Sequence, residues 1–170
     1  MEAFRVEFSL TSASVTLGDA AQAAGLKHAG HLAEWLDGKW LEHYTLGAFQ
    51  QVADQCKIHN YGMNLEPIGE PKFEFDVAAM RGYQLFAISC TTEHEVGRCK
   101  LKLFEAYLRA RQLGGDEARV GLVCCYGNPD YLRHQVERAW DAQGKVRVFG
   151  RADLPTLPAS LVDWFNTAAG

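Results

Sequence analysis

The spacing of apolar and polar residues changes along the chain, and these changes predict its helices and strands. Residues 4–10 alternate with a period of two, which predicts a half-exposed strand. Residues 20–24 favour a short helix with Asp19 as its N-cap, and residues 25–30 look like a break between elements. A longer helical pattern then covers residues 31–56, with an interruption near Gly38.

The middle of the chain is strand-rich. Residues 57–65 alternate weakly, whereas residues 72–79 and 84–90 have the composition of well-formed strands. The short connection at residues 80–83 predicts that the latter two form a hairpin.

A helix is predicted over residues 100–113, ended by the glycine pair that begins at Gly114. Its expected apolar face consists of Leu101, Phe104, Tyr107 and Leu108.

The rest of the chain alternates strands and helices. We expect a buried strand at residues 119–126, a helix at 129–142 capped by Asn128, a strand at 145–150 and a closing helix at 158–168. The whole order predicts a mixed α/β fold in which the last strands run parallel and are joined by right-handed crossovers.

The bulk composition is that of an ordinary globular domain of 170 residues, with 48% hydrophobic and 22% charged residues. The net charge of −4 argues against a broad electrostatic clamp for DNA, although a bound divalent metal reverses the sign of an acidic site. No apolar run is long enough for a membrane span, and no signal peptide is evident. The five cysteines contain no C-x-x-C pair. Cys90, Cys124 and Cys125 lie in apolar strand-like runs, so we expect buried, reduced thiols in a cytoplasmic protein.

Two acids in the strand pattern at residues 72–79 are the first candidates for chemistry. Alternation places Glu74 and Asp76 on the same face of the strand, opposite Phe73, Phe75 and Val77. A carboxylate within such an apolar run is costly unless it is paired. We therefore interpret Asp76 as a functional acid and Glu74 as its solvated neighbour.

Several segments together resemble a known family. They are Gly-Lys-Trp-Leu-Glu-His-Tyr from Gly38, Glu-Phe-Asp from Glu74, Ile-Ser-Cys-Thr-Thr from Ile88, and the helix that runs from Cys99 to Gly115. With Val120 to Val123, they resemble the PD-(D/E)xK nuclease domain of CARF-fused type III CRISPR effectors, which cyclic oligoadenylates switch on. The resemblance covers roughly residues 36 to 150 and implies a restriction-endonuclease-like mixed sheet flanked by helices.

The resemblance also implies an activity. It suggests a metal-dependent endonuclease that cleaves RNA or single-stranded DNA in antiviral defence, works as a homodimer and follows an upstream cyclic-oligoadenylate sensor domain. Asp76 and Glu42 would hold Mn²⁺ or Mg²⁺, both of which favour hard oxygen ligands. On this basis residues 37–170 are the nuclease domain, and residues 1–36 are an appendage or linker remnant.

The sequence departs from the family at the E-x-K element, where Ser89 and Thr91 replace the acid and the lysine. In one interpretation the site is rewired: Lys100 or Lys102 supplies the lysine, and Glu93 or Glu105 replaces the acid.

In the rewired site Ser89, Thr91 and His94 are the expected substrate contacts. In the other interpretation the domain is a catalytically inactive module for nucleic-acid or protein binding. A third alternative is an unrelated small α/β binding protein.

Overall fold

The computed structural model describes residues 16–68 and 73–167. Contacts between Cα atoms divide the chain into two compact units, and the division falls after Trp40. The sequence had suggested a boundary four residues earlier, after residue 36. The strand expected at residues 4–10 lies outside the described residues.

The described part of the first unit is helical. α1 spans Leu17–Ala23 and α2 spans Ala29–Glu34. The hydroxyl of Thr16 accepts a hydrogen bond from the backbone N–H of Asp19 at 3.2 Å, so Thr16 caps α1. The prediction of Asp19 as the cap was therefore wrong, because the threonine before it satisfies the first turn.

The expected helix break at Gly38 is confirmed. A wide helical turn covers Trp35–Lys39, and the backbone of Gly38 is non-helical there (φ 174°, ψ −23°). α3 follows at Trp40–Val52, and in the second unit it buries Leu41, Thr45, Ala48, Phe49 and Val52.

Within the described residues, five strands form one sheet in the order β1-β2-β3-β4-β5. The strands are β1 (Asn60–Leu65), β2 (Phe75–Arg81), β3 (Gln84–Thr91), β4 (Arg119–Cys124) and β5 (Val146–Phe149). β1, β2 and β3 are antiparallel neighbours, whereas β4 runs parallel to β3 and β5 parallel to β4. This confirms the predicted hairpin and the parallel half of the sheet.

Local signals explain the limits of these elements. The β2–β3 hairpin turns at Gly82, whose φ of 58° is easily reached only by a residue without a Cβ. α4 (Val96–Gly114) ends at Gly115, which has φ 60°. The side chain of Asn128 accepts from the N–H of Tyr131 and caps α5 (Pro129–Trp140), as the sequence indicated.

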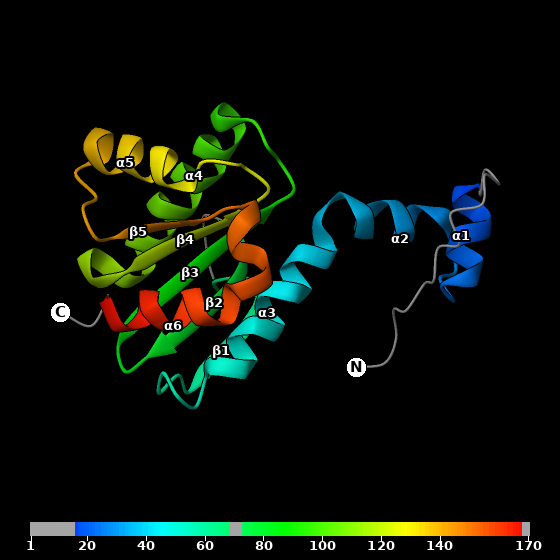
Figure 1. Ribbon diagram of the computed structural model, residues 1–170. Helices are drawn as coiled ribbons and strands as arrows, with labels where there is room; N and C mark the ends of the chain where they lie inside the picture. Colours follow the sequence, from blue (N-terminus) through cyan, green and yellow to red (C-terminus); the bar gives the residue numbers. More distant parts are fainter. Residues whose placement is uncertain (1–15, 69–72, 168–170) are drawn as a thin grey trace. The chain divides into compact units, whose positions relative to one another are not determined.

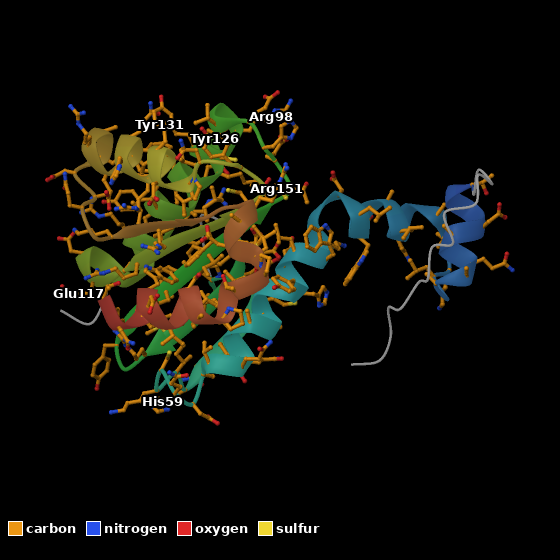
Figure 2. The ribbon with its side chains drawn as sticks, in the orientation of Figure 1. His59, Arg98, Glu117, Tyr126, Tyr131 and Arg151 are labelled. Carbon is orange, nitrogen blue, oxygen red and sulfur yellow. The ribbon has the colours of Figure 1, made fainter. Side chains whose placement is uncertain are left out.

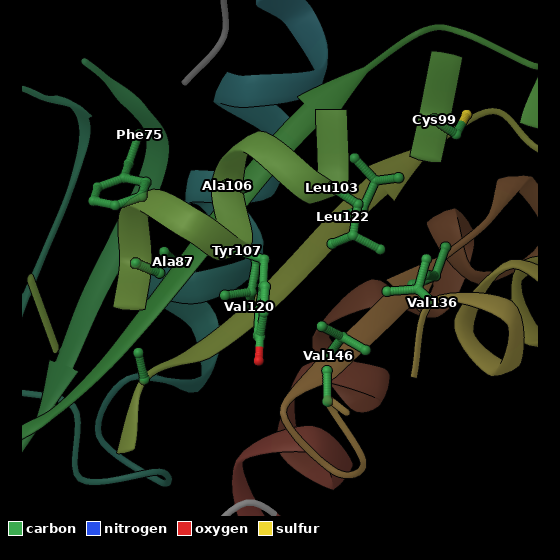
Figure 3. Packing of buried hydrophobic residues seen from close by; sticks show 14 of the residues in the cluster. Phe75, Ala87, Cys99, Leu103, Ala106, Tyr107, Val120, Leu122, Val136 and Val146 are labelled. Atoms are coloured by element: carbon green, nitrogen blue, oxygen red, sulfur yellow. The ribbon is translucent and has the colours of Figure 1, made fainter. Parts of the chain in front are cut away.

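Helices cover both faces of the sheet. α4 and α5 lie on one face, and α3 and α6 (Leu157–Thr167) lie on the other (Figure 1). On the α4 face, Leu103, Ala106 and Tyr107 pack over Val120 and Leu122 (Figure 3). The other face is held by an aromatic cluster of Phe49, Phe86, Phe149, Trp164 and Phe165.

The predicted apolar face of α4 was right for Tyr107, which is buried, and wrong for its three other residues. Leu101, Phe104 and Leu108 are exposed, with relative accessibilities of 60%, 37% and 45%. The face against the sheet is built instead from Cys99, Leu103, Ala106, Tyr107 and Ala110. Small residues at 99, 106 and 110 let the helix approach the strands closely, so the more hydrophobic stripe is not the buried one.

From α3 to β4 the chain forms a helix, an antiparallel three-strand meander, a second helix and a parallel strand. This arrangement is the α/β, restriction-endonuclease-like fold that the sequence predicted. In the part of the chain described here, no helix combines the length and the apolar character needed to cross a membrane.

The packing of α4 can be tested by truncating one leucine on each of its two faces. Leu103→Ala should destabilise the domain by about 2–5 kcal/mol, because it leaves a cavity at a fully buried position. Leu101→Ala should change the stability by less than about 0.5 kcal/mol. Urea unfolding followed by tryptophan fluorescence measures both, and equal losses would contradict the observed orientation of the helix.

Candidate functional site

The sheet splits between β2 and β3. Their paired register runs from Arg81–Gln84 to Val77–Ile88 and stops there. Beyond this point β2 continues beside β1, with Phe75 opposite Leu65, and β3 continues beside β4 as far as Thr91. Asp76 and Ser89 are the first residues past the last pair, so they lie where the two strands begin to diverge.

The carboxylate of Asp76 takes the place of the lost strand pairing. Its Oδ2 accepts a hydrogen bond from the Ser89 hydroxyl at 2.9 Å and another from the backbone N–H of Cys90 at 2.6 Å. A carboxylate that accepts such bonds is strongly held in one orientation. Asp76 is half-buried, and within the described residues it forms no ion pair with an arginine or lysine.

A small, open pocket lies over this split. β2 and the residues just before it contribute Glu74, Phe75 and Asp76, and β3 contributes Ile88 and Ser89. α4 contributes Lys102, Glu105, Ala106 and Arg109. The pocket therefore combines three carboxylates, two cations and one hydroxyl around the anchored Asp76.

The charged side chains from α4 share one face of that helix. Lys102, Glu105 and Arg109 are separated by three and four residues, which brings them to the same side. Arg109 and Glu105 approach to 3.9 Å, and both side chains remain partly exposed. This is a long contact at the i, i+4 spacing that is typical of surface ion pairs.

Cys90 lies behind the split, on the α3 face of the sheet. Its thiol is buried and lies 3.5 Å from the Thr45 hydroxyl of α3. Burial raises the pKa of this thiol strongly; the Thr45 contact opposes the shift, Asp76 and Glu42 add to it, and Lys102 opposes it weakly. Cys90 therefore stays protonated, and these three charges all act on one point.

Glu42 is half-buried on α3, in the second unit. Its charge acts on Cys90, as that of Asp76 does, but it is not among the described residues that line the pocket. The structure thus places Glu42 in the electrostatic neighbourhood of Asp76, from the opposite face of the sheet.

The other predicted site residues differ in burial and in whether they line the pocket. Ser89 lines it and donates to Asp76. Thr91 is buried, and its hydroxyl accepts from the N–H of Glu93. His94 is exposed in the loop before α4, and Lys100 is half-buried on α4. The pocket is lined by Lys102 and not by Thr91, His94 or Lys100.

One pocket residue, Arg109, was not named as a site residue from the sequence. Glu74, interpreted as a solvated neighbour of Asp76, is exposed as expected and also lines the pocket. The helical spacing of Lys102, Glu105 and Arg109 was visible, but the same spacing is typical of surface ion pairs. Glu93 is held in an ion pair with Arg98 at 2.7 Å, which leaves Glu105 as the acid that reaches the pocket.

The residues that follow the parallel strands mark the edge of the sheet near this site. Arg98, Tyr126 and Arg151 come after the C-terminal ends of β3, β4 and β5 (Figure 2). The backbone N–H of Arg151 donates to the carbonyl of Tyr126 at 3.2 Å, which ties the last two of these segments together. Because β2 is antiparallel to β3, Asp76 near its start lies toward the same edge.

No preformed metal cage is present in the described part of the chain. There, no group of three or more His, Cys, Asp or Glu side chains is arranged to hold a metal ion. The available ligands are single oxygen donors on different elements, with Asp76 the most firmly positioned of them.

Comparison with known proteins identifies shared folds. No family model matches the chain, and no curated protein matches it. The solved structure of VC1899 from Vibrio cholerae matches with a TM-score of 0.63 and 26% identity, covering 81% of this chain and 36% of that chain.

A second solved structure, Can2 from Sulfobacillus thermosulfidooxidans in complex with cyclic tetra-adenylate, matches with a TM-score of 0.67 and 19% identity. The match covers 92% of this chain and 47% of that chain. The chain therefore has a fold found in part of each protein and spans less than half the length of either.

The buried position of Cys90 predicts its reactivity. Native protein treated with iodoacetamide at about pH 8 should leave Cys90 unmodified, because its thiol is buried and its raised pKa suppresses the thiolate. Cys125 is half-buried and should react first. Peptide mass spectrometry with and without urea measures both; rapid native modification of Cys90 would show that the sheet opens at the split.

Proposed function

We propose that this chain is the nuclease part of a CRISPR-associated defence protein and hydrolyses phosphodiester bonds in RNA or single-stranded DNA with a divalent metal. The observation that carries the proposal is the position of Asp76. Its carboxylate is anchored at the split between β2 and β3, with Lys102 in the same open pocket, on a restriction-endonuclease-like fold.

The donor set fits Mg²⁺ or Mn²⁺. Both hydrogen bonds to Asp76 go to Oδ2, and among the described residues none goes to Oδ1. Mg²⁺ commonly uses one or two carboxylates and completes its shell with water and substrate phosphate, so it does not require a cage of three protein ligands. Asp76 would hold the metal, and Glu74 or Glu42 would assist directly or through water.

A bound metal of this kind supplies an activated water and neutralises phosphate charge. The chain's own residues have separate tasks. The Ser89 hydroxyl and the Cys90 N–H keep the Asp76 carboxylate in place. Lys102 reaches the same pocket from α4 and would stabilise negative charge that develops on the phosphate. It thus takes the role of the lysine that Thr91 replaces.

The relation to Can2 supports the biological setting. Can2 was solved with cyclic tetra-adenylate, and the chain matches less than half of it. In this proposal a cyclic-oligoadenylate sensor acts on the nuclease part, and two copies work together as a homodimer. Both features come from the resemblance, whereas the chemistry is argued from the residues of the pocket.

A catalytically inactive module is the second candidate, and two observations favour it. Ser89 occupies the position of the expected acid and is already bonded to Asp76. The described residues also lack a ready cluster of three metal ligands. Such a module would bind nucleic acid or a protein through the same pocket without cleaving.

Replacing the anchored acid separates these two functions. Asp76→Asn keeps the shape and still accepts from Ser89, but it removes the charge that holds the metal. Cleavage of labelled single-stranded RNA or DNA in Mn²⁺ should fall by about 100-fold or more, since metal catalysis contributes several kcal/mol to the barrier.

Glu117→Gln, at an exposed residue outside the pocket, is the matched control and should cleave like the unaltered protein. Thermal unfolding should show that both variants are folded. Full activity in Asp76→Asn would remove Asp76 from the mechanism, and no metal-dependent cleavage by the unaltered protein would favour the inactive module.

The two candidate lysines on α4 give a second test. Lys102→Ala should lower the cleavage rate by about 100-fold, because it removes one charge stabiliser from the pocket. Lys100→Ala should leave the rate close to that of the unaltered protein. Single-turnover kinetics on the same substrate measures both, and an undiminished rate in both variants would contradict a lysine supplied by α4.

A further inference from the structure

Arg109 is the positively charged pocket residue to which the chemistry above gives no task. Its guanidinium carbon lies 5.6 Å from the ring centroid of Phe73, and the Phe73 ring meets Phe75 edge-on at 5.4 Å. Phe75 is buried in the core, so this aromatic pair extends from the core to the rim of the pocket. The Phe73 ring thus positions the guanidinium of Arg109 through a cation–π contact.

We propose that Arg109, held against Phe73, binds a backbone phosphate of a single-stranded nucleic acid beside the bond that is cleaved. The substrate class rests on the proposed function. The assignment of this residue rests on its position in the pocket and on its contacts. Arginine is suited to this task because its planar group bonds phosphate oxygens while one face stacks on an aromatic ring.

Among the described residues, Arg109 has no strong polar partner. Its contact with Glu105 is 3.9 Å long, and among the described residues it makes no hydrogen bond. Other arginines form close ion pairs: Arg111 pairs with Asp116 at 2.6 Å, and Arg98 pairs with Glu93 at 2.7 Å. Arg109 is thus positioned by an aromatic contact that leaves its N–H groups available for a ligand.

The charge balance of the pocket agrees with this role. Three carboxylates and two cations line it, so a polyanion is repelled as long as no metal neutralises the acids. A bound divalent ion reverses that balance. Arg109 and Lys102 then face the same substrate, with Lys102 near the anchored Asp76 and Arg109 near the aromatic rim.

The salt dependence of binding tests this assignment without requiring cleavage. Anisotropy of a labelled single-stranded oligonucleotide is measured with the full chain in Ca²⁺, which supports binding, over a series of KCl concentrations. Each phosphate contact contributes about 0.7 to the slope of log K against log salt concentration for single strands. Arg109→Gln should make the slope less steep by about 0.7. The matched control Arg111→Gln should leave the slope unchanged.

Phe73→Leu tests the cation–π contact between Phe73 and Arg109. It keeps the charge of Arg109, so the slope should be retained while the affinity falls by about two- to fivefold. An unchanged slope in Arg109→Gln, or no binding by the unaltered protein, would overturn the inference, and an unchanged affinity in Phe73→Leu would remove Phe73 from it.

The two proposals fail differently. If cleavage requires Asp76 but the slope does not depend on Arg109, only the phosphate site is lost. If the slope depends on Arg109 but Asp76→Asn cleaves fully, the phosphate site stands and the mechanism fails.

Discussion

The site depends on one local exchange: a side-chain carboxylate replaces a neighbouring strand as the hydrogen-bond partner of β3. Where β2 and β3 separate, the N–H of Cys90 would lack a partner on that side, and Asp76 Oδ2 accepts from it. The cost of interrupting a buried ladder is offset by a strong, charge-assisted bond. The same bond fixes a negative charge at the mouth of an open pocket.

α4 completes the site because it has two different roles on two of its faces. One face packs small and medium side chains closely against β3 and β4. The adjacent stripe brings Lys102, Glu105 and Arg109 over the split. A helix held this closely to the sheet carries long charged side chains to a strand-borne carboxylate. This is how Lys102 reaches the same pocket as Asp76, although the two residues lie on different elements.

The charges that line the pocket do not cancel. Its acids outnumber its cations, so under the proposed function the binding of an anionic substrate would depend on a bound positive ion. The charges of Asp76, Glu42 and Lys102 all act on the pKa of Cys90 behind the split, and burial raises this pKa so that the thiol stays neutral. A neutral thiol adds no further charge at the point where these groups act on one another.

The local pattern of residues determined the element order, the hairpin, the helix break at Gly38 and the parallel half of the sheet. These features follow from short-range rules: alternation, caps and glycine turns act within a few residues. The same rules singled out Asp76, because a carboxylate in an apolar strand must find a partner.

Only the tertiary structure decided which face of α4 is buried, because close packing favours small residues at 99, 106 and 110 over the larger ones at 101, 104 and 108. It also decided that Lys102 and Arg109 reach the pocket while Lys100 does not line it. Helical spacing relates residues on one helix to each other, but the direction in which that helix faces depends on contacts with strands far away in sequence.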